Sequence, residues 1–367
     1  MNGNSKNTSL KLESFWNNNV ADRIYHDRTD FSEFAKRPIT TGIQKILNVY
    51  LKIPFQFSFN LIVLTSLFFS CMILSRIAKK MDSSRQNYLA IYFFILSCPI
   101  LLGFLGPMHM YDEPVQFFLI LLSMLMFIQK KELLAVIIFS IACVSRETSF
   151  LLLPYFLINR ELSAKQLLWF IPIIVYFLFF FLILDFNLRN QSIDFTTQTR
   201  FNFFKENFFD LKTSLVSLIN AFLVIGLPLI VATRAYQEET KANRRQIKLF
   251  LVIVIVNTIL VFITALAKEP RLFLLPLLLI WPMIPSFISK SIAEIRELKL
   301  DRVKIIGYIL ISLILAFAIY QPAVGKIGFL FKSYLSIYTF TIILFSFEIT
   351  NKKTVFLEDG IDLKHSK

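Results

Sequence analysis

The sequence is poor in charged residues, in cysteine and in histidine. Charged residues make up 17% of the 367 residues, whereas soluble globular domains carry about 25%, and this excludes a soluble enzyme with a water-covered surface. The three cysteines, Cys71, Cys98 and Cys143, lie in apolar runs, where a thiol behaves as a small hydrophobic group. The three histidines are too scattered for a metal cluster, and no CxxC or Cys/His spacing indicates a metal site.

The marks of nucleotide-driven chemistry are also missing. The chain contains no GxxxxGK[ST] run and no sign of a cytoplasmic nucleotide-binding domain, so the energy for any reaction must come from the substrate or from an ion gradient. Lys and Arg outnumber Asp and Glu by 39 to 25, a net charge of +14. Such an excess often indicates a nucleic-acid partner, but basic loops that orient helices in a bilayer explain it better here.

Apolar residues are what the sequence has in abundance, at 56% of the chain and a mean hydropathy of +0.62. A membrane-spanning helix needs about 20 mostly apolar residues. We find such runs at about 54–75, 88–106, 115–128, 133–159, 166–185, 214–233, 248–266, 272–289, 305–320 and 328–348. They predict an all-α fold, a polytopic transmembrane helical bundle over residues 54–348 with about 10–11 membrane-crossing segments.

The Lys and Arg residues of the short loops predict how these segments are oriented. Basic residues between 76 and 85, and the pair Lys130 and Lys131, place two loops in the cytoplasm, while the loop 107–114 between them has neither Lys nor Arg. Arg160 and Lys165 place the following loop in the cytoplasm as well. The run between these two cytoplasmic loops therefore crosses the membrane an even number of times.

We interpret that run, 133–159, as a broken hairpin of two short helices that bends near 145–149. The rival interpretation is one long tilted span, which would invert every later segment. Basic clusters at 234–248, 290–304 and 352–353 favour the hairpin, because all of them then face the cytoplasm. The C-terminal tail is then cytoplasmic, and the protein belongs in the inner (cytoplasmic) membrane of a bacterium.

The same orientation places residues 1–53 outside or at the interface, although they contain no signal peptide and no hydrophobic helix. Two explanations stay open. The tail passes out with the first span, or an earlier transmembrane helix has been lost from the annotated start; we favour the second slightly. Residues 349–367 form the cytoplasmic C-terminal tail.

Four groups of polar residues on or near the outer side interrupt the apolar pattern. Ionisable groups at membrane depth are costly, so each is a candidate functional site. Each also has a structural interpretation: a solvated tail, acids that complement a helix dipole, a capped ion pair, or an ordinary charged turn. The candidate residues are Asp27 and Asp30; Tyr111, Asp112 and Glu113; Arg146 and Glu147; and Lys268, Glu269 and Arg271.

The chemistry of these residue types suggests their roles. A pair of adjacent carboxylates such as Asp112 and Glu113 binds a divalent cation or acts as a general base. An Arg at a break in an apolar run, such as Arg146, receives a phosphate, because the guanidinium fork matches phosphate oxygens. Because all four groups fall on one side, they indicate a single outward-facing site that contains both acids and bases.

The layout resembles the GT-C superfamily of integral-membrane glycosyltransferases, which use polyprenyl-phosphate-linked sugars on the periplasmic or lumenal face. The run Tyr111, Asp112, Glu113 is similar to the Tyr-Asp-Asn-Glu run of oligosaccharyltransferase catalytic subunits. Asp27 or Asp30, followed by Arg37-Pro38, would match the acidic motif of that family's first outer loop. Glu269-Pro270-Arg271 resembles a Glu-x-Arg element that opens a late helix in several bacterial members. The family's first transmembrane helix has no counterpart here.

The resemblance implies a mechanism. Arg271, Lys268 or Arg146 would neutralise the leaving phosphate of the polyprenyl donor, and Asp30 or Asp27 would take a proton from the hydroxyl of a glycan or lipid acceptor. Asp112 and Glu113 would orient the acceptor or hold a divalent cation, Mg²⁺ or Mn²⁺. The loop 186–213 would cover the site.

Three other functions stay open. A Wzy-like polysaccharide polymerase or O-antigen ligase would suit the long outer loop 186–213 with its arginines. A transporter or flippase for a lipid-linked sugar predicts broken helices in matching halves of the chain, whereas the sequence shows one strong break. An inactive structural membrane protein is the last alternative. No nucleic-acid partner is expected for any of them.

Overall fold

The computed structural model describes residues 37–81, 112–158, 164–238 and 241–283 apart from 266 and 268, with a few residues between 306 and 314. These residues are almost entirely helical, and no strand occurs among them. The predicted all-α class is therefore confirmed for the described chain. The expected spans at 88–106 and 328–348 lie outside the described residues, as do the two tails at 1–36 and 349–367.

Three described helices are long and apolar enough to cross a membrane: Phe57–Met81, Gln166–Ile183 and Asn243–Thr264. A fourth candidate is the pair Thr197–Phe209 and Thr213–Gly226, which is bent by 93°. By length and composition, these helices could each cross a membrane. The total of about 10–11 crossings stays a prediction.

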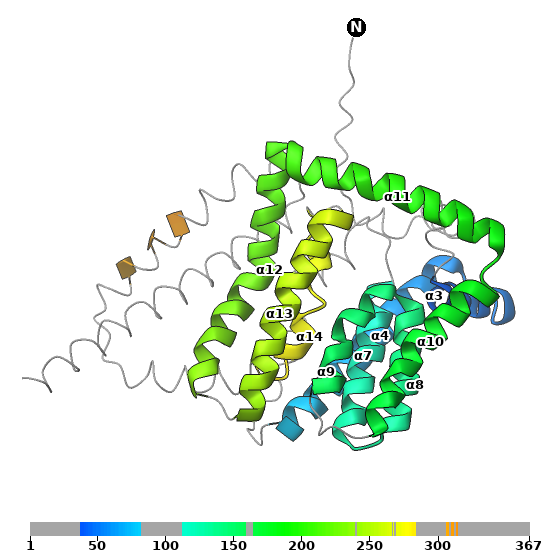
Figure 1. Ribbon diagram of the computed structural model, residues 1–367, viewed down its shortest axis with the longest axis horizontal. Helices are drawn as coiled ribbons and strands as arrows, with labels where there is room; N and C mark the ends of the chain where they lie inside the picture. Colours follow the sequence, from blue (N-terminus) through cyan, green and yellow to red (C-terminus); the bar gives the residue numbers. More distant parts are fainter. Residues whose placement is uncertain are drawn as a thin grey trace, which may run out of the picture.

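One group of helices packs around α7 (Figure 1). Helices α4 (Phe55–Met81) and α8 (Glu132–Ser145) both lie against α7 (Asp112–Ile128), and α10 (Ile171–Leu178) packs on α8. Helix α10 continues a 3₁₀ turn, η4 (Ala164–Phe170), and is followed by a π-helical turn, η5 (Phe179–Ile183). These three elements cover most of the predicted span 166–185. The core of this group is fully buried and apolar; it includes Leu74, Ile77, Ile120, Leu121, Phe139 and Phe156.

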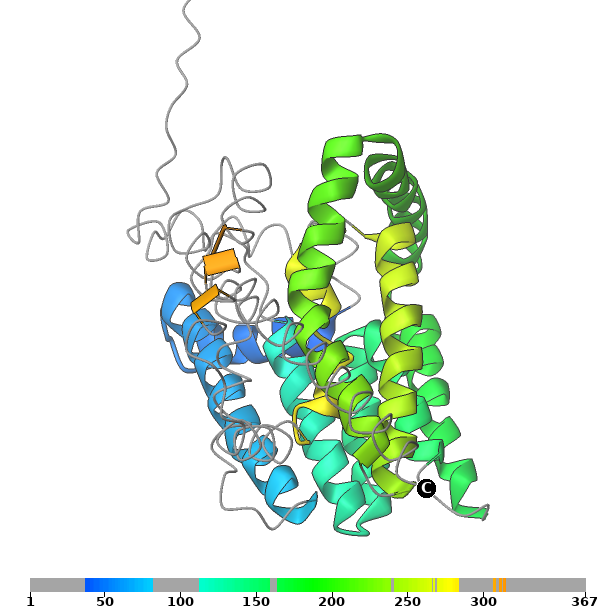
Figure 2. The ribbon, with the colours of Figure 1, turned by 90° about the vertical axis from the view of Figure 1, so that its left-hand side faces the viewer.

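A second group consists of α11 (Phe186–Phe209), α12 (Leu211–Glu238) and α13 (Lys241–Thr264), which contact one another. Helix α11 lies across one end of the bundle, nearly at right angles to α12 (Figures 1 and 2). The predicted outer connecting segment 186–213 is helical over most of its length. Residues 186–209 contain neither Gly nor Pro, so nothing in them interrupts a helix.

The predicted hairpin at 133–159 is confirmed as a reversal of the chain. Helix α8 ends at Ser145, and the next residue, Arg146, has an extended backbone (φ −159°, ψ 122°). The chain then returns as a 3₁₀ turn, η3 (Glu147–Leu152), and α9 (Leu153–Ile158). The Phe139 and Phe156 rings lie 4.9 Å apart between centroids, so the two arms run side by side in opposite directions.

The predicted span 272–289 is not one continuous helix over its described part. It consists of a 3₁₀ turn, η6 (Pro270–Phe273), and a single α-helical turn, α14 (Leu277–Ile280). Pro276 and Pro282 explain the break, because proline lacks the amide donor that a helix needs and clashes with the preceding turn. This segment packs between α12 and α13.

The two ends of the bundle differ in character. The C-terminal end of α4, the α7–α8 turn and the start of α13 lie together at the lower end in Figures 1 and 2. These parts carry the basic residues Lys79, Lys80, Lys130, Lys131, Arg244 and Arg245. The start of α7, the end of α8 and helix α11 lie at the opposite end. The basic turns are therefore separated from the break after α8 by the length of the helices.

Candidate functional site

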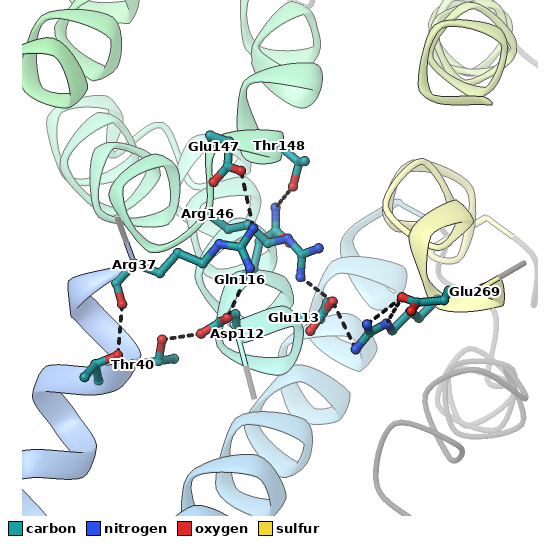
Figure 3. Close-up of polar contacts among 11 residues, drawn as sticks. Arg37, Thr40, Asp112, Glu113, Gln116, Arg146, Glu147, Thr148 and Glu269 are labelled. Carbon is teal, nitrogen blue, oxygen red and sulfur yellow. Dashed lines mark hydrogen bonds and ion pairs between the residues drawn. The ribbon is translucent and has the colours of Figure 1, made fainter. Parts of the chain in front are cut away.

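Four segments that are far apart in the sequence meet in one place (Figure 3), beside the start of α7 and the end of α8, which lie at the end of the bundle opposite the basic turns (Figure 1). They are the residue before α3 (Pro38–Lys45), the first turn of α7, the break between α8 and η3, and the start of η6. Each contributes charged side chains to two adjacent sets of ion pairs, which we together call the acid–arginine cluster. Its members are Arg37, Asp112, Glu113, Arg146, Glu147, Glu269 and Arg271.

Arg37 forms one half of the cluster. Its Nη1 lies 3.4 Å from Oδ2 of Asp112, and its Nη2 lies 3.3 Å from Oε1 of Glu147. Thr40, one helical turn into α3, donates a hydrogen bond to the other oxygen of Asp112. Both oxygens of Asp112 therefore have a protein partner, as is usual for a completely buried carboxylate.

Glu113 forms the other half. Its Oε1 is in contact with Nη1 of Arg146 and lies 3.8 Å from Nη1 of Arg271. The guanidinium of Arg271 also donates two hydrogen bonds to Oε2 of Glu269, at 2.6 and 3.1 Å. Glu113 thus lies between two guanidiniums. Arg146 belongs to the hairpin break and Arg271 to η6, about 125 positions later in the sequence.

The sequence around each member explains its position. Asp112 and Glu113 occupy the first turn of α7, where acids complement the helix dipole. One turn later, the buried Gln116 donates hydrogen bonds of 2.9 Å to the hydroxyls of Thr148 and Ser149. These bonds attach α7 to the hairpin break, so the acids on α7 face Arg146 and its neighbours.

Some guanidinium N–H groups in the cluster have no hydrogen-bond acceptor in the described part of the chain. They are Nε of Arg37 and Nε of Arg146, whereas Nη1 of Arg146 and Nη1 of Arg271 face Oε1 of Glu113 without forming a hydrogen bond of good geometry. Both oxygens of Glu113 likewise lack a hydrogen bond of good geometry there. A guanidinium has five donors in a planar fork, so these arginines retain donors for a further anionic group.

The charges of the cluster almost cancel. Four carboxylates face three guanidiniums, which leaves one net negative charge among the described members. Burial alone would lower the pKa of Arg37, but the carboxylates of Glu147, Asp112 and Glu113 raise it above its ordinary value. Arg37 therefore stays a cation beside these acids.

The predicted divalent-cation site does not fit the cluster as it is described. Among the residues that the structure places, no group of three or more acidic, His or Cys side chains shares a position for one ion. The carboxylate of Asp112 faces Arg37 and Thr40, and that of Glu113 faces two guanidiniums. The oxygens that would bind Mg²⁺ or Mn²⁺ thus already face cations or donors of the protein.

The predicted site residues that can be placed are all brought together. Asp112, Glu113, Arg146, Glu147, Glu269 and Arg271 all belong to the cluster. Asp27, Asp30, Tyr111 and Lys268 lie outside the described residues. The sequence analysis did not select the members or neighbours Arg37, Thr40, Gln116 and Thr148 as site residues. The signal for Arg37 was present in the Arg37-Pro38 pair that precedes α3.

The loop 186–213 was expected to cover the site with its arginines. Instead, Arg189 on α11 donates a hydrogen bond to the Phe181 carbonyl, and its guanidinium lies over the rings of Phe181 and Phe186. Arg189 is thus held by aromatic residues near the start of its own helix. It is not a member of the acid–arginine cluster.

Comparisons of this chain with protein-family models, with curated proteins and with solved structures return no match. The argument for a function therefore rests on the acid–arginine cluster and on the helices that surround it.

Proposed function

We propose that this protein is an integral-membrane glycosyltransferase that moves a sugar from a polyprenyl-phosphate donor to a lipid-linked or cell-envelope glycan acceptor. The observation that carries the proposal is the convergence of Asp112, Glu113, Arg146 and Arg271 on one buried cluster at the end of the bundle opposite the basic turns. Basic turns of membrane proteins face the cytoplasm, so the proposed site faces the periplasm or the exterior of a bacterial inner membrane.

Arg146 and Arg271 are the proposed phosphate ligands. Arg146 is buried and the side chain of Arg271 is 10% exposed. Nε of Arg146 has no acceptor among the described residues, and Nη1 of Arg271 forms no hydrogen bond of good geometry there. When the bond between sugar and phosphate breaks, negative charge develops on the phosphate oxygen that leaves. Positioned guanidiniums in a site with little water stabilise that charge without having to reorganise. Their carboxylate partner Glu113 keeps them in place before the donor arrives.

Asp112 is proposed to act on the acceptor side. It is fixed by Arg37 and Thr40, so it has one orientation rather than several. Each carboxylate oxygen has a second lone pair, and with it Asp112 would accept a hydrogen bond from a sugar hydroxyl and hold that hydroxyl near the reacting carbon. The proton of that hydroxyl then passes to a base, for which Asp30 or Asp27 is the candidate that the GT-C resemblance supplies.

The surroundings suit a donor with a long apolar chain. Helices α4, α10 and α13 expose large apolar side chains along their length, among them Leu64, Phe68, Ile174, Phe177, Val252 and Ile255. Surfaces of this kind face lipid tails in a membrane protein. A polyprenyl chain could therefore stay in the bilayer while its phosphate enters the cluster.

A transporter for a lipid-linked sugar is the second candidate, and one observation favours it. Transporters bind their substrates at discontinuous helices, and the described part of the chain has such breaks at Arg146 and at residues 269–276. Both breaks contribute to the acid–arginine cluster. The two functions differ in whether a covalent bond of the sugar changes.

A deletion strain tests the proposal. If the protein is the glycosyltransferase, the strain accumulates a polyprenyl-linked donor and lacks one sugar of a mature glycan, as mass spectrometry of both fractions would show. A plasmid with Asp112→Asn or Arg271→Ala should leave this defect in place while protein remains in the membrane, and Arg189→Ala should correct it.

A wild-type glycan profile in the deletion strain, or full correction by both site variants, would refute the proposal. A sugar-complete glycan precursor that is trapped on the cytoplasmic side would indicate the transporter.

A further inference from the structure

Two carboxamide side chains of α13 hold the discontinuous segment of η6 and α14, which carries Arg271. Asn257 donates from Nδ2 to the carbonyl of Leu272 at 3.0 Å, and Gln246 donates from Nε2 to the carbonyl of Leu279 at 2.6 Å. The two donors lie three helical turns apart on α13, and their acceptors follow in the reverse order. The segment 272–279 therefore runs antiparallel to α13 and is attached to it at two points.

A third carboxamide, Asn207 of α11, fixes the beginning of this segment. It donates to the carbonyls of Phe262 and Ala265 at the end of α13, at 2.8 and 2.6 Å. Its Oδ1 accepts a hydrogen bond from the backbone N–H of Ala267 at 3.1 Å. Asn207 is 1% exposed, so it acts as a buried cap where the helix gives way to the irregular chain.

These contacts satisfy backbone groups that the segment cannot satisfy by itself. In a bilayer, irregular backbone is tolerated only where protein groups or enclosed water pair its N–H and C=O groups. Asn257 and Gln246 are 3% and 6% exposed, and the helix that bears them is otherwise mostly apolar where it could span the membrane. An apolar side chain at either position would leave a buried carbonyl without its donor, which is costly.

We propose that Asn257 is a positioning residue for Arg271, and that Gln246 supports it. The carbonyl that Asn257 holds belongs to Leu272, the residue directly after Arg271, so this hydrogen bond fixes the backbone from which the guanidinium extends toward Glu113. The functional meaning of this placement rests on the proposed role of Arg271 in phosphate binding. The placement itself can be measured without that role.

Cysteine cross-linking measures the placement. The background is the full-length protein with Cys71, Cys98 and Cys143 replaced by Ala. The reporter pair is Glu113→Cys and Arg271→Cys. A short bifunctional methanethiosulfonate cross-links this pair in native membranes. Adding Asn257→Leu should slow cross-linking of this pair about tenfold, the effect of one lost buried hydrogen bond. Gln246→Leu, tested in parallel, should also slow it. Asn257→Gln keeps a carboxamide donor and should recover most of the rate.

Two controls separate positioning from general damage. The pair Ile158→Cys and Arg245→Cys reports on the opposite end of α13, where Arg245 donates to the Ile158 carbonyl at 3.1 Å, and its cross-linking should not change with Asn257→Leu. Ile255→Leu, at a lipid-exposed position of the same helix, should leave both pairs unchanged. Equal rates with and without Asn257→Leu and Gln246→Leu, or an equal loss in both pairs, would overturn the proposal.

Sugar transfer, measured in the same variants but with Glu113 and Arg271 intact, distinguishes this inference from the proposed function. Cross-linking is still measured in the reporter-pair protein. Loss of sugar transfer in Asn257→Leu, with slowed cross-linking of the reporter pair, supports both. Slowed cross-linking in a protein whose wild-type form transfers no sugar refutes the glycosyltransferase and leaves the positioning role intact. Normal transfer together with unchanged cross-linking refutes the positioning role alone.

Discussion

Arg37, the residue before α3, is the cation that pairs with two acids of the acid–arginine cluster. Its guanidinium faces Asp112, which is completely buried, and Glu147, which is partly exposed. Removing one partner of a buried ion pair leaves the other charge without compensation, at a cost of about 3 kcal/mol or more. At the residue scale, the cluster is therefore a set of mutually dependent charges rather than a sum of separate contacts.

Arg37→Met should accordingly lower the free energy of unfolding in detergent by about 3 kcal/mol, since Met keeps the volume and removes the charge. Lys45→Met is the matched control, because Lys45 is an exposed basic residue of the same helix, and it should change stability by less than about 0.5 kcal/mol. Denaturant titration followed by circular dichroism measures both. Equal stabilities of the two variants would mean that Arg37 does not stabilise the cluster.

The residues of the cluster were predictable to different degrees. Asp112, Glu113, Arg146 and Arg271 could be selected because each interrupts an apolar run on the predicted outer side. Gln116 could not, because an uncharged side chain within α7 gives no such signal, and its role depends on the hydroxyls that the returning chain brings beside it. Pairings of this kind depend on helix rotation, which loop charge does not determine.

At the scale of the element, the broken hairpin of α8, η3 and α9 positions the cluster. Its turn is held from two sides, since Ser149 donates to the Ala142 carbonyl at 2.9 Å and accepts a hydrogen bond from Gln116. Below the turn, Trp169 stacks on Phe156 with ring centroids 4.1 Å apart. The polar turn and the aromatic arms together keep Arg146 at the end of α8.

Gln116→Leu should loosen this turn, because it removes both hydrogen bonds from α7 to the break. Two hydrogen bonds of about 1 kcal/mol each correspond to an increase of about 30-fold in local opening. Hydrogen–deuterium exchange of a peptide that covers residues 145–152 measures it. Gln129→Leu, at the far end of α7, should leave that peptide unchanged, and an unchanged rate in Gln116→Leu would show that the turn does not need α7.

The sequence predicted some elements better than others, for physical reasons. Loop charge identified the hairpin at 133–159, because two successive basic loops require an even number of crossings. The apolar run 272–289 was predicted as one span, and its break was missed, because hydropathy does not distinguish a continuous helix from a buried irregular segment. Pro276 and Pro282 were the available signal. The helix at 186–209 was missed because its composition is too polar for a spanning segment.

On the scale of the whole molecule, the basic turns and the acid–arginine cluster lie at opposite ends of the bundle (Figure 1). This separation predicts the sidedness of chemical labelling. In a background without Cys71, Cys98 and Cys143, a membrane-impermeant maleimide should label Asp210→Cys, at the exposed corner between α11 and α12, in intact spheroplasts. Lys131→Cys, in the exposed α7–α8 turn, should react only after the membrane is permeabilised. The reverse pattern would place the cluster on the cytoplasmic side.

The measurement that tests the central claim most directly is sugar transfer by purified protein in liposomes. The donor is the radiolabelled polyprenyl-linked fraction that accumulates in the deletion strain, and the acceptor is the incomplete glycan of that strain. The wild-type protein and Arg189→Ala should transfer the label at similar rates. Arg271→Ala should lower the rate by about 100-fold or more, the usual effect of removing one group that stabilises developing charge. Transfer by Arg271→Ala at the wild-type rate, or no transfer by the wild type, would contradict the account.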